Sequence, residues 1–127
     1  MKKIKKALIS VSDKKNLKDL LKVLVKYKIK LISSGGTYKE IRKLQFECLE
    51  VSEYTGSPEI LGGRVKTLHP KIHAGILSKR KNKSHCKDLK NNNFEEIDLV
   101  IVNFYPFEKT LEQTNNHLKV IENIDVG

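Results

Sequence analysis

The 127-residue chain has no long hydrophobic run. A membrane-spanning helix needs about 20 mostly apolar residues, and the sequence offers no such stretch, so we expect no membrane span. The basic segment Met1–Lys6 is followed only by the short apolar run Ala7–Ile9 before polar residues return. That run is too short for the hydrophobic core of a secretory signal. The sequence therefore predicts a protein without a membrane partner.

Cysteine is also scarce. Cys48 and Cys86 are the only two cysteines, and they lie in unrelated sequence contexts. A small secreted domain stabilised by disulfides would carry a denser and more regular cysteine pattern. We therefore expect reduced thiols and a cytoplasmic protein.

Arginine and aromatic residues are few, although the net charge is +10. Arginine is the favoured reader of bases, and the chain contains only Arg42, Arg64 and Arg80. The four tyrosines and four phenylalanines are scattered, so no platform for stacking bases is visible. Nucleic-acid binding is one interpretation of the charge. We favour a lysine-coated solvent face suited to a phosphorylated small molecule.

Short apolar strands alternate with helical segments along the chain. We expect strands at 7–11, 30–34, 46–51 and 98–104, and helices at about 14–27, 38–45, 107–113 and 117–123. Asp13 is the expected N-cap of the first helix, and the polar segment 79–93 is expected to be a solvated helix or a mobile excursion. The apolar run that begins at Leu99 predicts a strand buried on both faces. The alternation predicts right-handed βαβ units around a mainly parallel sheet in one domain.

Three polar clusters follow the expected strands: Ser10–Lys14, Ser33–Thr37 and Asn103–Tyr105. In a parallel sheet, the carboxyl ends of the strands lie at one edge, where ligands collect, so we expect these clusters to converge. Helix N-termini at this edge would attract a phosphate, and Gly35 and Gly36 would let it approach the backbone. An ordinary capped turn and an ordinary Gly-Gly turn are the alternative interpretations.

The segment Gly62–Gly75 has the composition of a loop and carries five basic or titratable side chains. Lys66 could donate a proton or stabilise an oxyanion. Pro70 separates His69 from His73, which argues against a helical HExxH zinc site, and no cysteine or carboxylate is close enough to complete a metal site. We expect both histidines to hold the loop by hydrogen bonds and no metal to bind.

Five segments together follow the pattern of one family in order and spacing. They are Ser10–Lys14, Ser34–Thr37, Gly62–Leu77, Asp98–Phe107 and Ile121–Gly127. The chain resembles the N-terminal inosine monophosphate (IMP) cyclohydrolase domain of bifunctional purine-biosynthesis enzymes, whose other domain is the aminoimidazole carboxamide ribonucleotide formyltransferase. The resemblance covers essentially the whole chain. It implies a three-layer, methylglyoxal-synthase-like α/β fold with a mainly parallel sheet, a homodimer and no cofactor.

The resemblance also implies a reaction that closes the second purine ring. The carboxamide nitrogen of 5-formamidoimidazole-4-carboxamide ribonucleotide attacks the formyl carbon of the same molecule, and loss of water gives IMP. Because both groups belong to one molecule, orientation supplies much of the acceleration. Lys66 would stabilise the formyl oxygen, Asp125 would assist deprotonation of the carboxamide, and Tyr105 would orient the substrate and relay a proton.

The site residues implied by the resemblance form two groups. The catalytic group is Lys66, Tyr105 and Asp125. The group that binds the nucleotide, largely at its phosphate, is Ser12, Asp13, Lys14, Ser34, Gly35, Gly36, Thr37, Arg64, Val65, Thr67, Val102, Asn103 and Val126. Within the second group, Asn103 would bind the base or the ribose, and the Val126 N–H would be a further donor.

The family pattern continues past Asp125–Gly127 with a second glycine and a helix that carries another catalytic lysine. This sequence stops at Gly127. We therefore expect residues 1–127 to be an incomplete cyclohydrolase domain without the formyltransferase domain, in which binding survives better than turnover.

Two rival functions on the same fold stay open. A non-catalytic regulatory domain that binds nucleotides or phosphate would share the phosphate turns but would not need Lys66, Tyr105 and Asp125. A methylglyoxal-synthase-type lyase would need catalytic carboxylates beside the phosphate. Asp13 is the only candidate there, and it has the position of a helix cap.

Overall fold

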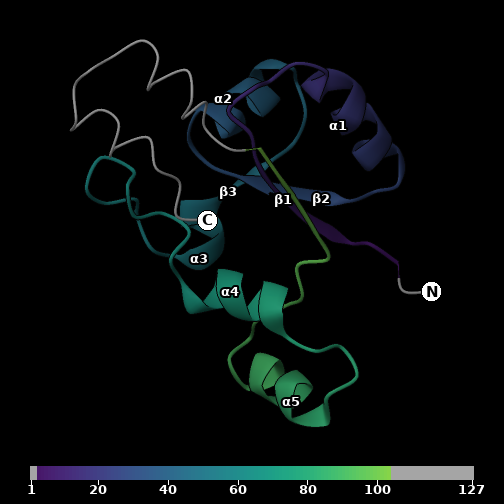
Figure 1. The fold of residues 1–127 in the computed structure, drawn as a ribbon, viewed down its shortest axis with the longest axis vertical. Helices are drawn as coiled ribbons and strands as arrows, with labels where there is room; N and C mark the ends of the chain where they lie inside the picture. Colours follow the sequence, from purple (N-terminus) through teal and green to yellow (C-terminus); the bar gives the residue numbers. More distant parts are fainter. Residues whose placement is uncertain (1–2, 104–127) are drawn as a thin grey trace.

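The computed structural model describes residues 3–103, which form a parallel sheet flanked by helices (Figure 1). Within this range, four strands pair in the order β3-β2-β1-β4. They are β1 (Lys6–Ser10), β2 (Lys30–Ser33), β3 (Leu49–Glu50) and β4 (Leu99–Val102), and all the pairings are parallel. The expected parallel sheet is confirmed.

Helices cover both faces of this sheet. Helices α1 (Leu17–Lys26) and α2 (Gly35–Lys43) lie on one side, and α3 (Val51–Thr55) and α4 (Pro70–Leu77) lie on the other (Figure 1). Helix α5 (Lys83–Asn91) lies beyond α4. The predicted three-layer α/β architecture is therefore confirmed. None of the helices between residues 3 and 103 has the length and hydrophobicity needed to cross a bilayer.

The side chains of β1 alternate between two buried clusters, as the period of a strand requires. Ala7 and Ile9 pack with Leu21 in the cluster under α1 and α2. Leu8 packs with Ile72 in the cluster under α3 and α4. Full burial of a leucine or isoleucine side chain contributes roughly 1.5–3 kcal/mol. The two clusters hold the strand ends, and the polar turns that follow them, in fixed relative positions.

The start of α1 differs from the prediction. The residue before the helix is Asn16, in a left-handed conformation with φ of 64° and without a side-chain cap. Asp13 does not cap the helix. Its Oδ1 atom accepts a hydrogen bond of 2.9 Å from the N–H of Lys15, which is typical of an Asx turn. The helix thus begins at Leu17, and residues 11–16 form an irregular turn after β1.

The prediction of a loop through residue 75 was wrong, because α4 occupies Pro70–Leu77. Proline suits the first position of a helix, where its missing N–H is not needed. His69 caps the same end, with Nδ1 accepting a hydrogen bond of 3.0 Å from the N–H of Lys71. Gly75 allows close packing, since a Cβ there would lie only 2.8 Å from the Glu95 carbonyl oxygen.

His69 and His73 are consequently one helical turn apart, so the geometric part of the argument against a helical histidine pair was also wrong. The expected holding role is confirmed for His69 by its cap. It is wrong for His73, whose exposed side chain makes no hydrogen bond within residues 3–103.

Two strand predictions also need correction. The third strand is only Leu49–Glu50, because Val51–Thr55 turns into α3. Strand β4 pairs with β1 alone among residues 3–103, and its side chains alternate between half-buried and exposed. Val102 is 57% exposed, which contradicts the predicted burial on both faces within the described part of the chain.

The polar segment 79–93 forms α5, which confirms its helical alternative. The helix expected at 38–45 begins earlier, at Gly35. The helices expected at 107–113 and 117–123 lie outside the described residues.

Candidate functional site

The carboxyl ends of β1 and β4 are joined by the carboxamide of Asn103. Its Oδ1 atom accepts hydrogen bonds from the Ser12 N–H at 2.6 Å, from the Ser12 hydroxyl at 3.1 Å and from the Asp13 N–H at 3.4 Å. Its Nδ2 group donates to the Asp13 carbonyl oxygen at 3.1 Å. The turn after β1 is thus attached to the end of β4.

The end of β2 is joined to the same turn by Thr37. This residue is buried in the first turn of α2, and its hydroxyl donates to the Val11 carbonyl oxygen at 2.9 Å. The Thr37 hydroxyl oxygen in turn accepts a hydrogen bond from the Val11 N–H at 3.2 Å. Together with the bonds of Asn103, these bonds confirm that the first two predicted polar clusters converge with the described part of the third, Asn103, at one edge of the sheet.

Ser33 adds a connection that sequence reasoning did not assign. Its fully buried hydroxyl donates to the Ile9 carbonyl oxygen at 2.6 Å. The only available signal was a hydroxyl at the end of an apolar strand.

Two lysine side chains reach the N-terminus of α2. A Cβ built on Gly36 would lie 3.9 Å from Lys14 Nζ, and one built on Gly35 would lie 3.3 Å from Lys66 Nζ. Lys14 Nζ also donates to the carbonyl oxygens of Val11 at 3.0 Å and Ser12 at 3.4 Å, which fixes its position. We call Ser34–Thr37, Lys14 and Lys66 the anion cradle.

The electrostatics of the anion cradle favour a negative ligand. Ser34 occupies the N-cap position of α2 without a side-chain hydrogen bond to the helix, and the first turn contains no acidic residue. The first N–H groups of a helix lack partners within the helix and carry a partial positive charge. With two ammonium groups beside them, they form a site suited to a phosphate or carboxylate.

Lys66 reaches the anion cradle from a tight turn that precedes α4. Ile60 and Val65 form an antiparallel bridge, with N–H···O distances of 3.0 and 3.3 Å between their backbones. Gly62 and Gly63 lie within this turn with φ of 66° and 83°, in the left-handed region that glycine tolerates. The predicted site residues Arg64 and Val65 precede Lys66 on this loop, and Thr67 follows it.

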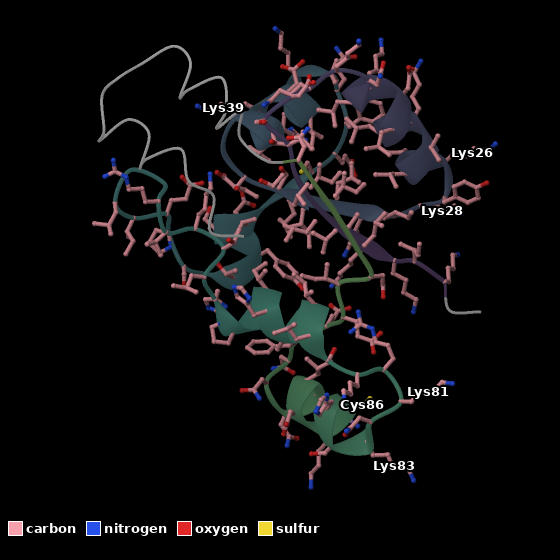
Figure 2. All side chains as sticks on the ribbon, in the orientation of Figure 1. Lys26, Lys28, Lys39, Lys81, Lys83 and Cys86 are labelled. Carbon is pink, nitrogen blue, oxygen red and sulfur yellow. The ribbon has the colours of Figure 1, made fainter. Side chains whose placement is uncertain are left out.

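Most lysines of the described chain differ from these two, because they extend into solvent. Lys26, Lys28 and Lys39 point away from the ribbon, as do Lys81 before α5 and Lys83 at its start (Figure 2). This arrangement agrees with the predicted lysine-coated surface. The half-buried Lys14 and Lys66, by contrast, place their Nζ atoms at the N-terminus of α2.

Not every predicted site residue can be placed. Val102 lies on β4 opposite Ser10 of β1, next to the joined strand ends. Tyr105, Asp125 and Val126 lie outside the described residues.

A groove of about 930 Å³ lies elsewhere, towards the amino ends of β1 and β2. It is lined by Lys30, Tyr54 and Lys71 among others, and by no residue of the anion cradle. Lys71 Nζ lies 4.3 Å from the centre of the Tyr54 ring, so this ammonium group already has an aromatic partner. We assign the candidate site to the anion cradle, where uncapped helix N–H groups and two cations meet.

Comparisons with known proteins agree with this architecture. The family model described as "MGS-like domain" matches residues 16–127. The bifunctional purine biosynthesis protein PurH of Prochlorococcus marinus (strain MIT 9301) is 54% identical over 122 residues, which are 95% of this chain and 24% of that protein. PurH of Oenococcus oeni (strain ATCC BAA-331 / PSU-1) is 50% identical over 125 residues, 98% of this chain and 25% of that protein.

The chain thus spans about a quarter of the length of these curated relatives. Among solved structures, one described as "Crystal structure of ForH" superposes with a TM-score of 0.73 at 34% identity, covering 80% of this chain and 51% of that one. Since the family match extends over most of the sequence, the chain belongs to the MGS-like domain family.

Proposed function

We propose that this chain is the nucleotide-binding part of an IMP cyclohydrolase, which converts 5-formamidoimidazole-4-carboxamide ribonucleotide to IMP. One observation carries the proposal: Lys14 and Lys66 converge on the uncapped N-terminus of α2. The sequence resemblance and the similarity to PurH proteins, which are named for purine biosynthesis, support the choice of a purine nucleotide.

The nucleotide phosphate would bind in the anion cradle. An ammonium group has three N–H donors, and Lys14 uses two of them on the Val11 and Ser12 carbonyl oxygens at 3.0 and 3.4 Å. One donor therefore remains for a phosphate oxygen. Gly36 adds no side chain to the first turn of α2, so an anion can approach the N–H groups of the helix.

Lys66 would act on the reacting part of the substrate. As the carboxamide nitrogen bonds to the formyl carbon, negative charge develops on the formyl oxygen, and a nearby ammonium group stabilises it. The carboxamide nitrogen then gives up one proton and the formamido nitrogen gives up another. Both protons reach the oxygen, which departs as water, and a C=N bond remains in the closed ring. The proposed proton-transfer roles of Tyr105 and Asp125 and the donor role of the Val126 N–H complete this scheme.

The test is turnover by the purified chain, followed as an absorbance change on addition of the formamido ribonucleotide. Lys66→Ala should lower kcat by about 100-fold or more, as removal of one oxyanion-stabilising group commonly does. Lys81→Ala removes an equal charge from the exposed surface far from the anion cradle and should leave turnover unchanged. Dihydroxyacetone phosphate should give no reaction, and reaction with it would favour the lyase.

Binding of IMP, measured by calorimetry, separates the remaining alternative. A chain that binds IMP but never turns over the formamido ribonucleotide would be a nucleotide-binding regulatory domain or a fragment that lacks catalytic groups. A chain that binds no purine nucleotide would refute the proposed function.

A further inference from the structure

The Lys66 ammonium group is carried by a short connection between two fixed points. One is Val65, whose backbone forms an antiparallel bridge with N–H···O distances of 3.0 and 3.3 Å. The other is His69, the N-cap residue of α4. Only residues 66–68 lie between them, and Leu68 is 75% exposed, so it is held by little packing. The position of the ammonium group therefore depends on how each end is held.

The first end is held by bonds within its own turn. Besides the bridge, the Gly63 N–H donates to the Ile60 carbonyl oxygen at 3.2 Å, and the Arg64 N–H donates to the Leu61 carbonyl oxygen at 3.3 Å. Arg64 makes a further interaction as well. None of these backbone bonds involves His69, so a substitution at His69 leaves this turn intact.

The second end is held by His69 through both its side chain and its backbone. Nδ1 accepts a hydrogen bond of 3.0 Å from the Lys71 N–H. The His69 carbonyl oxygen accepts from the Ile72 and His73 N–H groups, both at 3.1 Å, and the His69 N–H donates to the Thr67 carbonyl oxygen at 2.8 Å. Ile72 is 1% exposed and packs in the core, so α4 is a fixed support. His69 thus joins the residue that follows the lysine to a helix held by the core.

The two ring nitrogens of His69 have different surroundings. Because Nδ1 accepts a hydrogen bond, the proton of the neutral ring is assigned to Nε2. The Nε2–H group makes no hydrogen bond to residues 3–103. Two uses are therefore open to the ring, a cap through Nδ1 and a bond to a ligand through Nε2, and a substitution that keeps only the first separates them.

We propose that His69 is a positioning residue for Lys66: the cap at Nδ1 fixes the start of α4, and the short connection then carries the ammonium group to the first turn of α2. The approach is close, since a Cβ built on Gly35 would lie 3.3 Å from Lys66 Nζ. The inference rests on the proposed function, because Lys66 is the group that would stabilise the formyl oxygen. A cap that only stabilised α4 would leave the turnover of the folded protein unchanged.

A double-mutant cycle tests whether His69 acts through Lys66. His69→Ala should lower kcat for the formamido ribonucleotide by about tenfold, because a misplaced stabilising group loses much of its effect. In a chain that already carries Lys66→Ala, the same substitution should lower kcat by no more than about twofold. Equal losses in the two backgrounds, or no loss in either, would overturn the positioning role.

His69→Asn shows which ring nitrogen acts. Asparagine is a preferred N-cap residue whose neutral carboxamide can accept from the Lys71 N–H, but its side chain ends before the position of Nε2. It should restore the slow hydrogen exchange of the Lys71 amide, which His69→Ala accelerates, and most of the lost kcat. A protected Lys71 amide without recovery of kcat would assign the effect to Nε2 and overturn the inference.

His73→Ala is the matched control. His73 is an exposed histidine one turn further along α4 and makes no hydrogen bond through its side chain within residues 3–103, so kcat should stay unchanged. A loss as large as that in His69→Ala would count against a specific role of the cap.

Inorganic phosphate separates this inference from the proposed function, because its binding needs no turnover. Titration followed by NMR of the α2 backbone amides should show that His69→Ala lowers the affinity about threefold or more when Lys66 is present, and leaves it unchanged in the Lys66→Ala chain. If the chain binds phosphate but never converts the formamido ribonucleotide, the proposed function fails, and this dependence on Lys66 still supports the positioning role. Equal losses of phosphate affinity in both chains overturn the role, and a chain without phosphate binding or turnover refutes both proposals.

Discussion

Replacement of Gly35 by alanine tests the geometry of the anion cradle directly. Gly35 is the first residue of α2 and has φ of +56°, in the left-handed region. A Cβ there would also lie 3.3 Å from Lys66 Nζ. Gly36, the next residue, lacks the positive φ, and its Cβ would meet only Lys14 atoms at 3.9 and 4.0 Å, which is ordinary contact. The two neighbouring glycines therefore form a matched pair.

The expected free energies follow from the backbone. A side chain in the left-handed region costs roughly 1–2 kcal/mol. Both substitutions restrict the unfolded chain and so contribute about 0.4–1 kcal/mol of stability where the fold tolerates them. Gly35→Ala should therefore lower the free energy of unfolding by about 0.5–1 kcal/mol, and Gly36→Ala should raise it by a similar amount. Their difference, about 1–2 kcal/mol, contains only the left-handed cost because the unfolded-state contribution cancels.

The assay is urea unfolding of both variants followed by circular dichroism, with the slopes of the two transitions compared to verify that they are equal. Gly35→Ala should also weaken IMP binding by about tenfold, because the new methyl group displaces the Lys66 ammonium from the end of α2. Equal unfolding midpoints for the two variants, or a more stable Gly35→Ala, would refute the reasoning.

Three further predictions concern other parts of the fold. Gly75→Ala should lower the free energy of unfolding by about 1–3 kcal/mol in urea, because its Cβ would meet the Glu95 carbonyl oxygen at 2.8 Å; unchanged stability would contradict this close packing. Burial raises the pKa of the Cys48 thiol to about 11, so a thiol reagent at pH 8 should label the exposed Cys86 first, and equal labelling rates would be inconsistent with that burial. The hydrogen bond and charge of Lys6 lower the pKa of Glu95 below its ordinary value of 4.5. The stability from this pair is present above pH 4.5 and is lost as the pH falls through the lowered pKa, so Glu95→Gln should flatten the acid limb of the stability curve; an unchanged limb would count against the pair.

The parallel sheet and its polar edge were predictable because they depend on local patterns. Apolar strands alternating with amphipathic helices leave few topologies, and in each of them the carboxyl ends of the strands share an edge. The clusters at Ser12 and Thr37 could thus be placed together without knowledge of any contact. The hydrogen bond of 2.9 Å from the Thr37 hydroxyl to the Val11 carbonyl oxygen shows that the two clusters are in contact.

Helix α4 was missed because proline and glycine have opposite meanings in different positions. Pro70 ends a helix if it is interior and starts one if it is first, and the cap that decides between them is His69, a residue not usually counted as a cap. In the sequence alone, Gly75 suggests the end of a helix. The structure shows instead that Glu95 and Ile97 pack closely against it. The prediction that β4 is buried on both faces failed for a similar reason. An apolar run does not specify how many neighbouring strands and helices pack against it.

Asn103 shows where sequence patterns stop being informative about a site. An asparagine at the end of a strand can bond to a ligand or to a neighbouring turn, and both uses need the same residue at the same position. In this structure its carboxamide makes four hydrogen bonds of 2.6–3.4 Å to Ser12 and Asp13. Lys66 illustrates the opposite case, because its charge was evident from the sequence. Its approach to Gly35, 31 residues earlier in the chain, depends on the turn between Ile60 and Val65. A site of this kind is therefore assigned by residue type from sequence, but the division between groups that contact the ligand and groups that hold them must come from geometry.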